Sequence, residues 1–458
     1  MSNTASAFIE SNQERFLEEL LTFLRIPSIS TLPENRGDVR KAAEFVAASL
    51  SSVGMENVEI IETEGHPLVY ADWLHAPGKP TVLCYGHYDV QPPDPLELWN
   101  SPPFEPAIRD GNLYARGSAD DKGQMYIHVK AVEALMQTAG QLPLNVKFLV
   151  EGEEEIGGKS VAKFVAENGE KLRADVALVS DTAMYAPGLP TLCVGLRGLV
   201  YTELAMKGPA RDLHSGLYGG AAPNPVFGLI ELLSQAKDAG GRILIPGFYD
   251  DVEDAGEVEL ESWKTLPFNE AEFLAKELGS PSLTGESEYS VLERVWSRPT
   301  LEVHGIAGGF TGAGAKTVIP SEATAKVSFR LVPNQNPDKI MDAFRAFVAE
   351  RTPAGLTAEV RLLSGGPACM VDPDHPAIRV AASAFEEIFE RETVFVRSGG
   401  SIPIVGDFAT HLGIPTVLMG FGLPDDGLHS PNEKFALSNF YKGIQTVAHF
   451  LQKYGESS

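Results

Sequence analysis

Histidine and acidic residues follow several short apolar runs of this chain, and the first such place is the most informative. His87 and Asp89 come shortly after Thr81–Cys84, a run with the length and branching of a buried β-strand. Side chains two apart in a strand point to the same side, so both would emerge at its carboxyl end. A neutral imidazole is the commonest metal ligand, and a neighbouring carboxylate can fix its tautomer. A loop histidine beside a solvated aspartate explains this segment alone equally well.

Two adjacent aspartates, Asp120 and Asp121, stand just before Gly123 at the start of a predicted helix. An N-cap stabilised by the helix dipole would explain one aspartate and leave the second unexplained. The alternative is that Asp120 bridges two metal ions with one oxygen to each, because two close divalent ions need a bridge to offset their repulsion. The segment alone leaves both interpretations open.

Four glutamates, Glu151 and Glu153–Glu155, follow the apolar strand-like run 146–150. A solvated acidic turn is the usual explanation of such a run of charge. These residues occupy a strand end, however, where one carboxylate can bind metal while its neighbour accepts the proton of a water molecule.

Two further segments end in the same kinds of residue. Asp181 follows the apolar run Val176–Val179, and His429 lies in a loop near the carboxyl end of the chain. Together the five segments supply two histidines and three carboxylates as candidate ligands, with one glutamate to spare. Mixed nitrogen and oxygen ligation suits zinc, and also cobalt or manganese. The sequence therefore indicates a metal site built from the loops of one sheet.

The elements that must position these residues alternate between strand and helix. Strand-like runs at 58–61, 68–73, 81–85, 146–150 and 176–179 are interspersed with helical patterns at 39–53, 123–138 and 159–167, after a first amphipathic helix over 8–24. This alternation predicts an α/β fold with a mostly parallel sheet flanked by helices, in which ligands bind at the carboxyl ends of strands.

From about Gly195 the pattern changes. Strands that alternate in polarity are predicted over 200–206 and 323–331, and the stretch 246–299 is acidic and rich in helix breakers. The helical pattern near 376–390, a strand near 415–419 and a last helix over 437–452 then resume the first pattern. We therefore predict that residues 1–194 and 367–458 form a catalytic metal-binding domain, interrupted by a smaller α+β domain over 195–366.

The composition limits the class of protein. A chain of 458 residues, 43% hydrophobic and 22% charged, fits a soluble globular protein of two domains. Its 62 acidic residues against 37 basic ones give a net charge of −25, which argues against nucleic acid or an anionic membrane as a partner. The three cysteines are widely spaced in apolar runs, so we expect buried thiols rather than disulfides. We find no pattern of a signal peptide or membrane span and expect a cytoplasmic protein.

The five segments, in their order from His87 to His429, resemble the dinuclear zinc amidohydrolases that include carnosine dipeptidase, aminoacylase, carboxypeptidase G and succinyl-diaminopimelate desuccinylase. The resemblance covers nearly the whole chain and depends on five ordered motifs rather than on one. It implies two divalent metal ions, zinc first and manganese or cobalt as alternatives. It also implies a lid or dimerisation role for the inserted domain.

Residue by residue, the resemblance assigns the candidate ligands to two ions. His87 and Asp181 match the ligands of one ion, and Glu155 and His429 match those of the other. Asp120 matches the carboxylate that bridges them.

Three further features follow from the same resemblance. Asp89 matches the partner that orients the first histidine, and Glu154 matches the general base. The additional Glu153 leaves open a register in which it is the base instead. The peptide between Asp120 and Asp121 is expected to be cis, a costly conformation without proline.

Segments of the inserted domain and of the chain after it resemble the dipeptidase branch of the family. His214 resembles a lid histidine that reaches across a homodimer to stabilise an oxyanion, and Arg330 resembles the arginine that grips the substrate carboxylate. Gly400 and Ser401 lie in a segment that resembles the glycine-rich loop of the same pocket.

These matches imply a metal-dependent dipeptidase that cleaves next to a free C-terminal carboxylate. The alternative is an N-acyl-amino-acid deacylase or desuccinylase with the same metal centre, because only the acyl-side pocket separates the two. The stretch 309–317 superficially resembles a phosphate-binding loop, but Ala315 replaces the glycine required before Lys316. We expect a lid loop there.

Overall fold

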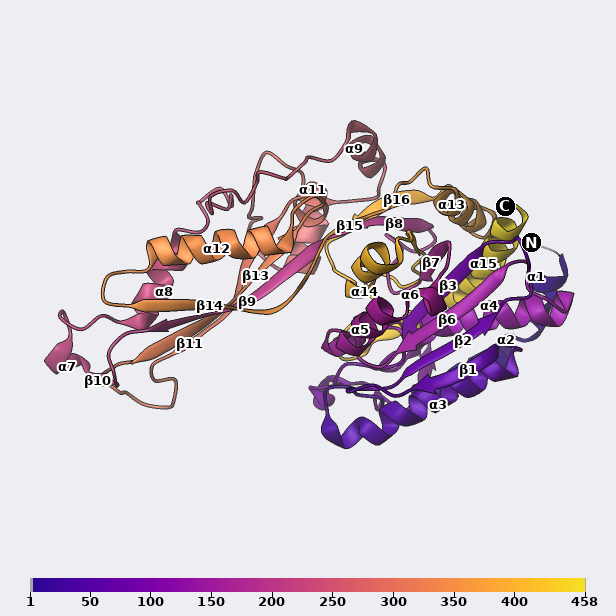
Figure 1. The fold of residues 1–458 in the computed structure, drawn as a ribbon, viewed down its shortest axis with the longest axis horizontal. Helices are drawn as coiled ribbons and strands as arrows, with labels where there is room; N and C mark the ends of the chain where they lie inside the picture. Colours follow the sequence, from indigo (N-terminus) through magenta and orange to yellow (C-terminus); the bar gives the residue numbers. More distant parts are fainter. Residues whose placement is uncertain (1–2, 458) are drawn as a thin grey trace. The chain divides into compact units, whose positions relative to one another are not determined.

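The computed structural model describes residues 3–457, which divide into two compact units (Figure 1). The first unit comprises the chain up to Val194 together with 371–396 and 407–458, and the second comprises 195–370 and 397–406. The segment 397–406 belongs to the second unit, although its place in the sequence groups it with the catalytic domain. The roles predicted for these domains, catalysis on one side and lid or dimerisation on the other, stay predictions.

The first unit is an α/β assembly. Its strands are β1 (Glu56–Ile61), β2 (Leu68–Trp73), β3 (Thr81–His87), β4 (Ala107–Arg109), β5 (Asn112–Tyr114), β6 (Asn145–Glu151), β7 (Val176–Val179), β17 (Thr416–Leu418) and β18 (Lys434–Ala436), while β8 (Thr191–Leu196) and β16 (Val394–Ser398) begin in it and end in the second unit. Its helices are α1 (Asn3–Ser11), α2 (Gln13–Leu24), α3 (Arg36–Ser52), α4 (Lys122–Ala139), α5 (Lys159–Glu167), α6 (Gly169–Leu172), α13 (Pro376–Phe389) and α15 (Leu437–Glu456), with short turns η3 (Glu154–Ile156) and η5 (Phe408–Leu412).

From β1 to β8 the large sheet has the order β1-β2-β6-β3-β7-β17-β8, and β15 (Cys369–Met370) and β16 each pair with β8. The central strands β6, β3, β7 and β17 are parallel, whereas β1, β2 and β8 join antiparallel at the two sides. This arrangement confirms the predicted α/β class and its mostly parallel sheet. The carboxyl ends of β3, β6 and β7 meet at one edge, because His87 pairs in register with Glu151 and Tyr85 with Val179.

Both faces of the central strands are covered, which explains why the run Val82–Cys84 of β3 is apolar without alternation. Gly86 faces α4, since a side-chain carbon placed there would meet Met125 at 2.6 Å. Tyr85 points to the opposite face, where its ring makes an edge contact with Phe408 of η5. Helix α15 packs on α4, and α13 packs on α15.

The predicted first helix over 8–24 is two helices. The chain breaks between α1 and α2 at Asn12, whose side-chain amide donates to the carbonyl of Phe8 at 2.8 Å. An asparagine side chain that bonds nearby backbone competes with the helical ladder, a local effect that apolar periodicity does not reveal.

The second unit is built on an antiparallel sheet of order β11-β13-β9-β14. Its elements are β9 (Gly198–Lys207), β10 (Leu213–His214), α7 (Ser215–Tyr218), α8 (Pro225–Ser234), α9 (Glu257–Lys264), α10 (Glu270–Glu272), η4 (Phe273–Leu278), α11 (Val291–Trp296), β11 (Thr300–Gly308), β12 (Val318–Ile319), β13 (Glu322–Leu331), α12 (Pro337–Arg351), β14 (Thr357–Gly366) and β15 (Cys369–Met370), with most of α14 (Pro403–Asp407). Helices α8 and α12 supply Leu229, Leu232 and Phe344 to the core beneath this sheet.

The acidic stretch 246–299 forms short helices joined by loops. It is held by Arg298, whose guanidinium donates to both oxygens of Glu286 at 2.9 and 3.1 Å. Both side chains are almost entirely buried, so this ion pair holds the segment together with its buried apolar side chains, which include Phe248, Trp263 and Leu266.

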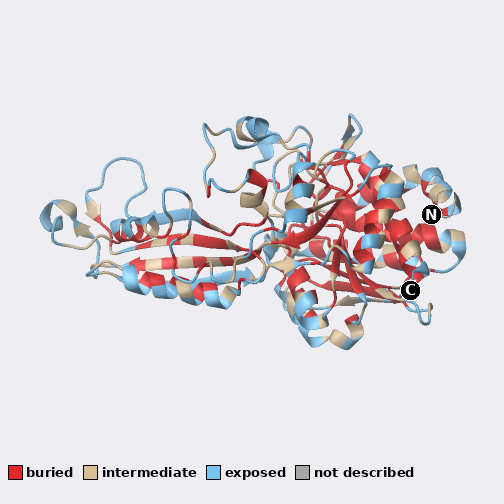
Figure 2. Ribbon diagram, turned by 90° about the horizontal axis from the view of Figure 1, so that it is seen from above, coloured by how far each residue is buried: buried red, intermediate tan, exposed pale blue. Residues whose placement is uncertain are grey.

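Each unit has its own buried interior (Figure 2). Cys84 and Cys193 are buried and Cys369 is partly exposed, and none of the three, all of which lie in the described part, forms a disulfide. Within residues 3–457, we find no helix with the length and apolar character that a membrane span requires.

Candidate metal centre

The predicted ligands lie at the carboxyl edge of the parallel strands and in two loops beside it. Two groups form, His87 with Asp120 and Asp181, and Asp120 with Glu155 and His429. In each group the candidate ligand atoms all lie within 4.8 Å of one another. All five residues predicted from the sequence are thus brought together, and Asp120 belongs to both groups.

The carboxylate of Asp120 faces two histidines with different oxygens. Its Oδ1 lies 3.2 Å from His87 Nε2, and its Oδ2 lies 2.9 Å from His429 Nε2. His429 Nε2 is also 3.2 Å from Glu155 Oε2. A carboxylate with one oxygen toward each of two ligand groups has the arrangement that a bridge between two cations requires.

The state of His87 fits a metal ligand. The side chain is fully buried, and its Nδ1 lies 3.1 Å from the carbonyl oxygen of Asp89, which leaves Nε2 facing the cluster. Among residues 3–457, Nε2 forms no hydrogen bond of good geometry, although Asp120 Oδ1 lies 3.2 Å away and its charge acts on the ring. A buried nitrogen without a partner is costly, and a metal ion beside it would remove that cost.

The electrostatics of the cluster also fit bound cations. Burial, together with the nearby charges of Asp120 and Asp121, raises the pKa of Asp181 well above its ordinary value. Burial acts against charge on His87 as well, but the carboxylates of Asp120 and Asp89 raise its pKa above the usual range. Crowded buried acids that hold protonated histidines between them are a site where divalent ions can replace protons.

The carboxylate of Asp89 lies 3.3 Å from His87 Nδ1 and also contacts the turn after β6. Its Oδ1 accepts a hydrogen bond from the backbone N–H of Glu154 at 3.3 Å, and its Oδ2 accepts one from that of Glu155 at 3.2 Å. One buried carboxylate therefore fixes the turn η3, which carries both glutamates, against the end of β3.

The structure distinguishes Glu153 from Glu154. The carboxylate of Glu153 accepts backbone N–H groups of His66 and Ser160, each at 3.1 Å. Burial raises the pKa of Glu154 to about 7, with the charges of Glu155 and Asp120 adding to it and His87 opposing it. A carboxyl group that readily exchanges a proton near neutrality suits a general base, which favours the register with Glu154.

The loops that carry Asp120 and His429 have unusual backbone geometry. The Asp120–Asp121 peptide is cis, which confirms the prediction. His429 has a φ of 59°, a left-handed conformation that is uncommon outside glycine, and its side chain is 56% exposed. The cluster is therefore accessible to solvent on the side where the imidazole of His429 lies.

Several residues that support the ligands were missed by the sequence analysis. Gln91 donates through Nε2 to Glu155 Oε2 at 2.7 Å, and the buried His128 shares a 2.7 Å hydrogen bond with Ser180, next to Asp181. Glu433 accepts four hydrogen bonds from the loop of Asp120. Gln91, Ser180 and Glu433 each lie within four residues of a predicted ligand, so proximity to a ligand along the chain was the available signal.

The remaining predicted site residues lie in the second unit. Arg330 Nη1 donates to Ser401 Oγ at 2.8 Å, and Ser401 Oγ in turn donates to the carbonyl of Arg197. The backbone N–H of Arg197 donates to the carbonyl of Gly400 at 3.2 Å. His214 ends β10, is exposed, and accepts the N–H of Gly216 at Nδ1.

The stretch 309–317 is no phosphate-binding loop. It is almost wholly exposed and connects β11 to the short strand β12, whereas that motif requires a helix directly after the glycines.

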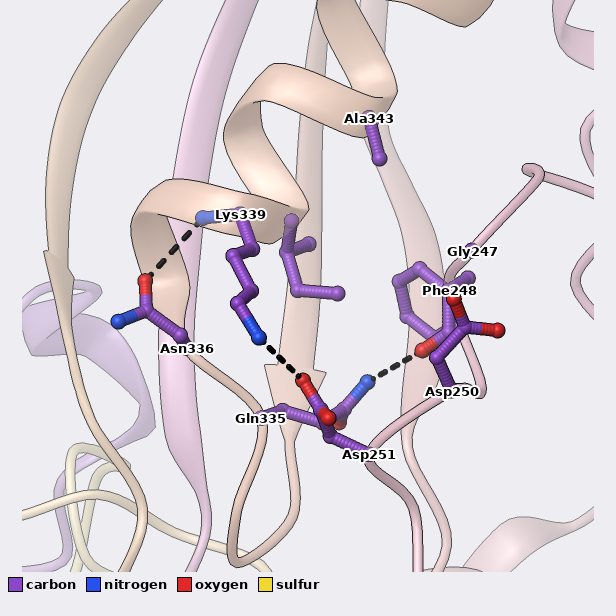
Figure 3. Close-up of a pocket in the computed structure, with 9 residues that line it drawn as sticks. Gly247, Phe248, Asp250, Asp251, Gln335, Asn336, Lys339 and Ala343 are labelled. Atoms are coloured by element: carbon purple, nitrogen blue, oxygen red, sulfur yellow. Dashed lines mark hydrogen bonds and ion pairs between the residues drawn. The ribbon is translucent and has the colours of Figure 1, made fainter.

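A separate pocket of about 340 Å³ lies between α12 and residues 247–251 of the second unit (Figure 3). Its polar groups already bond one another, since Lys339 Nζ lies 3.1 Å from Asp251 Oδ2 and Gln335 donates to the carbonyl of Phe248. Neither of the two metal-compatible groups found among the described residues includes a residue of this pocket.

Comparison with known proteins yields matches along most of the chain. The profile of peptidase family M20/M25/M40 matches residues 83–453. The Cys-Gly metallodipeptidase DUG1 of Candida albicans is 34% identical over 98% of this chain and 96% of its own length. The human Beta-Ala-His dipeptidase is 30% identical over 97% of this chain and 91% of its own length. Among solved structures, the M20 family metallo-carboxypeptidase Sso-CP2 of Sulfolobus solfataricus superposes with a TM-score of 0.88 at 33% identity, covering 96% of this chain and 99% of that one.

Proposed function

This chain belongs to peptidase family M20/M25/M40, and we propose that it is a metal-dependent dipeptidase that cleaves the peptide bond next to a free C-terminal carboxylate. The observation that carries the proposal is the position of Asp120, whose two carboxylate oxygens face His87 and His429 separately. The names of the relatives, which are dipeptidases acting on small peptides, support the substrate class.

We propose that His87, Asp181 and Asp120 hold one divalent ion and that Asp120, Glu155 and His429 hold the other. Two bound ions would lower the pKa of a water molecule and polarise the scissile carbonyl. The mixture of imidazole and carboxylate ligands suits zinc, and manganese and cobalt are the alternatives to test.

Glu154 is proposed to move the proton of the reaction. It accepts a proton from the attacking water and passes it to the amine that leaves. Its burial and its raised pKa support this role, because a base with a pKa near the working pH both accepts and returns a proton efficiently. Asp89, which accepts the N–H groups of Glu154 and Glu155, keeps the base in position.

The substrate carboxylate is proposed to bind Arg330. A guanidinium presents two parallel N–H groups to a carboxylate, and among the described residues no acidic side chain forms a hydrogen bond or ion pair with Arg330. Ser401 fixes its orientation through the 2.8 Å hydrogen bond, and Gly400 leaves room for a ligand to approach the backbone.

We further propose a homodimer in which His214 of a second copy stabilises the oxyanion of the tetrahedral intermediate. The second unit offers a surface for such an assembly. Strand β11 is an edge strand, exposed along most of its length, and the adjacent helix α8 presents Phe227 and Ile230, which are 70% and 50% exposed. An exposed strand edge beside exposed apolar side chains favours pairing with a second copy.

We place the protein in the cytoplasm, which the three cysteines support, since all lie outside disulfides and disulfides are rare in that compartment.

The test is hydrolysis of a panel of dipeptides, their C-terminal amides, and N-acetyl and N-succinyl amino acids. Each is assayed with chelator, and then with zinc, manganese or cobalt restored. We expect chelator-sensitive cleavage of dipeptides with free carboxylates and little cleavage of the amides. Cleavage of the acylated amino acids alone would replace the proposal with a deacylase, and turnover that survives complete metal removal would refute it.

A further inference from the structure

Glu433 is a buried carboxylate whose hydrogen-bonding capacity is directed at one short loop. Its side chain is fully buried. Oε2 accepts from Arg116 Nη1 at 2.8 Å and from the N–H of Gly117 at 3.0 Å, while Oε1 accepts from the N–H groups of Ala119 and Asp120 at 2.9 and 3.1 Å. Three backbone donors and one guanidinium thus converge on a single side chain.

The loop is shaped to make this convergence possible. Gly117 has a φ of 84°, and a side-chain carbon there would lie 2.7 Å from Val90. Gly123 approaches the carbonyl of Ser118 so closely that a side-chain carbon would lie 1.9 Å from it. Both positions therefore require glycine, and the resulting turn points its N–H groups inward at Glu433.

The same residue belongs to the segment that carries His429. The backbone carbonyl of Glu433 accepts the N–H of Ala115, and β18 continues from it as the antiparallel partner of β5. Asn432, just before it, accepts the N–H of Asn100 at 2.8 Å. Glu433 consequently joins the loop of Asp120 to the loop of His429, and these two residues face each other at 2.9 Å.

We propose that Glu433 is a positioning residue for the metal centre, and that it acts chiefly on the ion assigned to Asp120, Glu155 and His429. The inference depends on the proposed function only for the identity of the metal ions. Asp181, a ligand of the other ion alone, follows β7 and shares no hydrogen bond with Glu433 among the described residues. Loss of Glu433 should therefore weaken the binding of the ion held by Asp120, Glu155 and His429 more than the binding of the other ion.

Glutamine at this position tests the idea because it keeps the size of the side chain. A carboxylate only accepts hydrogen bonds, whereas an amide turns one of its two ends into a donor that would face the loop's own N–H groups. Metal-stripped Glu433→Gln protein is titrated with zinc against a chromophoric chelator, which gives two stepwise dissociation constants. We expect one constant to rise by about 10- to 100-fold, the usual effect of losing a residue that supports a ligand, and the other to change less.

Asp426→Asn is the matched control. Asp426 is also a fully buried carboxylate in the same stretch of chain, but it accepts from Leu423 N–H and Lys434 Nζ and forms no hydrogen bond to the loop of Asp120. This variant should keep both zinc constants. At saturating zinc, Glu433→Gln should show a lower kcat for dipeptides with a nearly unchanged KM. The kcat is expressed per folded molecule, because a smaller folded fraction alone would also lower the apparent kcat and leave KM unchanged.

If the unpaired guanidinium of Arg116 prevents Glu433→Gln from folding, the double variant Arg116→Gln, Glu433→Gln removes that charge while still lacking the acceptor. Wild-type zinc constants in Glu433→Gln or in the double variant would overturn the inference. An equal shift of both constants would also overturn it. An Asp426→Asn shift as large as that of Glu433→Gln would do the same. A wild-type protein that binds two zinc ions and cleaves no dipeptide would refute the proposed function alone, since the titration reads metal binding without turnover.

Discussion

Replacing Glu154 and Glu153 separately by glutamine should give opposite results. Glutamine keeps the shape of either side chain but cannot accept the proton of water. Removing a general base costs about 10²- to 10⁴-fold in rate, or roughly 3 to 5 kcal/mol of transition-state stabilisation. We therefore expect kcat of Glu154→Gln to fall by at least two orders of magnitude, with both metal ions retained because Glu154 belongs to neither ligand group.

The stability of the folded protein should respond to these two substitutions in the opposite order to the activity. The ordinary pKa of Glu154, near 4.5, is raised to about 7 in the folded protein, so ionisation at pH 8 destabilises the fold by an amount on the order of 3 kcal/mol. Glu154→Gln removes this penalty, and the metal-stripped variant should unfold at the same or a higher temperature. Glu153→Gln instead sets an amide donor against the N–H of His66 or Ser160, which costs about 1 to 3 kcal/mol.

The assay is steady-state hydrolysis of one dipeptide by both variants, with metal content and thermal unfolding measured on the same preparations. The expected pattern is an inactive, stable Glu154→Gln and an active, destabilised Glu153→Gln. An active Glu154→Gln beside an inactive Glu153→Gln would refute the reasoning and move the base one residue earlier.

Three further predictions concern other parts of the chain. Phe227→Glu should yield a monomer with little activity in light scattering and kinetics, whereas Val258→Glu, a change at an apolar residue that is 86% exposed on α9, should leave both unchanged; an active monomer would contradict catalysis across a dimer. Ser401→Ala should raise KM for dipeptides several-fold with little change in kcat, because it frees Arg330, and an unchanged KM would remove Ser401 from the pocket. Burial lowers the pKa of His128 from its usual 6.5 to about 3, so stability is fully present above pH 6.5 and is lost as pH falls toward 3, by up to about 5 kcal/mol. His128→Gln should reduce this loss of unfolding free energy at acid pH, measured by urea unfolding at a series of pH values. An unchanged loss would show that other groups cause it.

The fold of the first unit could be predicted from the sequence because its signals are local. Runs such as Thr81–Cys84 and Val176–Val179 are apolar without alternation, which is the pattern of strands covered on both faces, and the structure has them as β3 and β7. Where a side chain competes with the backbone the same reasoning failed, as at Asn12, since periodicity carries no information about that contact.

The candidate site was predictable to the extent that strand ends are. His87, Glu155 and Asp181 follow parallel strands whose ends must meet at one edge, so elementary topology brings them together. Asp120 and His429 do not follow strands of that sheet, so only their residue types suggested them as ligands, and the resemblance then assigned them to the two ions. What brings them together is Glu433, 313 residues from Asp120 along the chain, through hydrogen bonds that no local pattern encodes. A metal centre of this kind therefore has ligands that residue type and spacing can suggest, and supports that only the folded chain identifies.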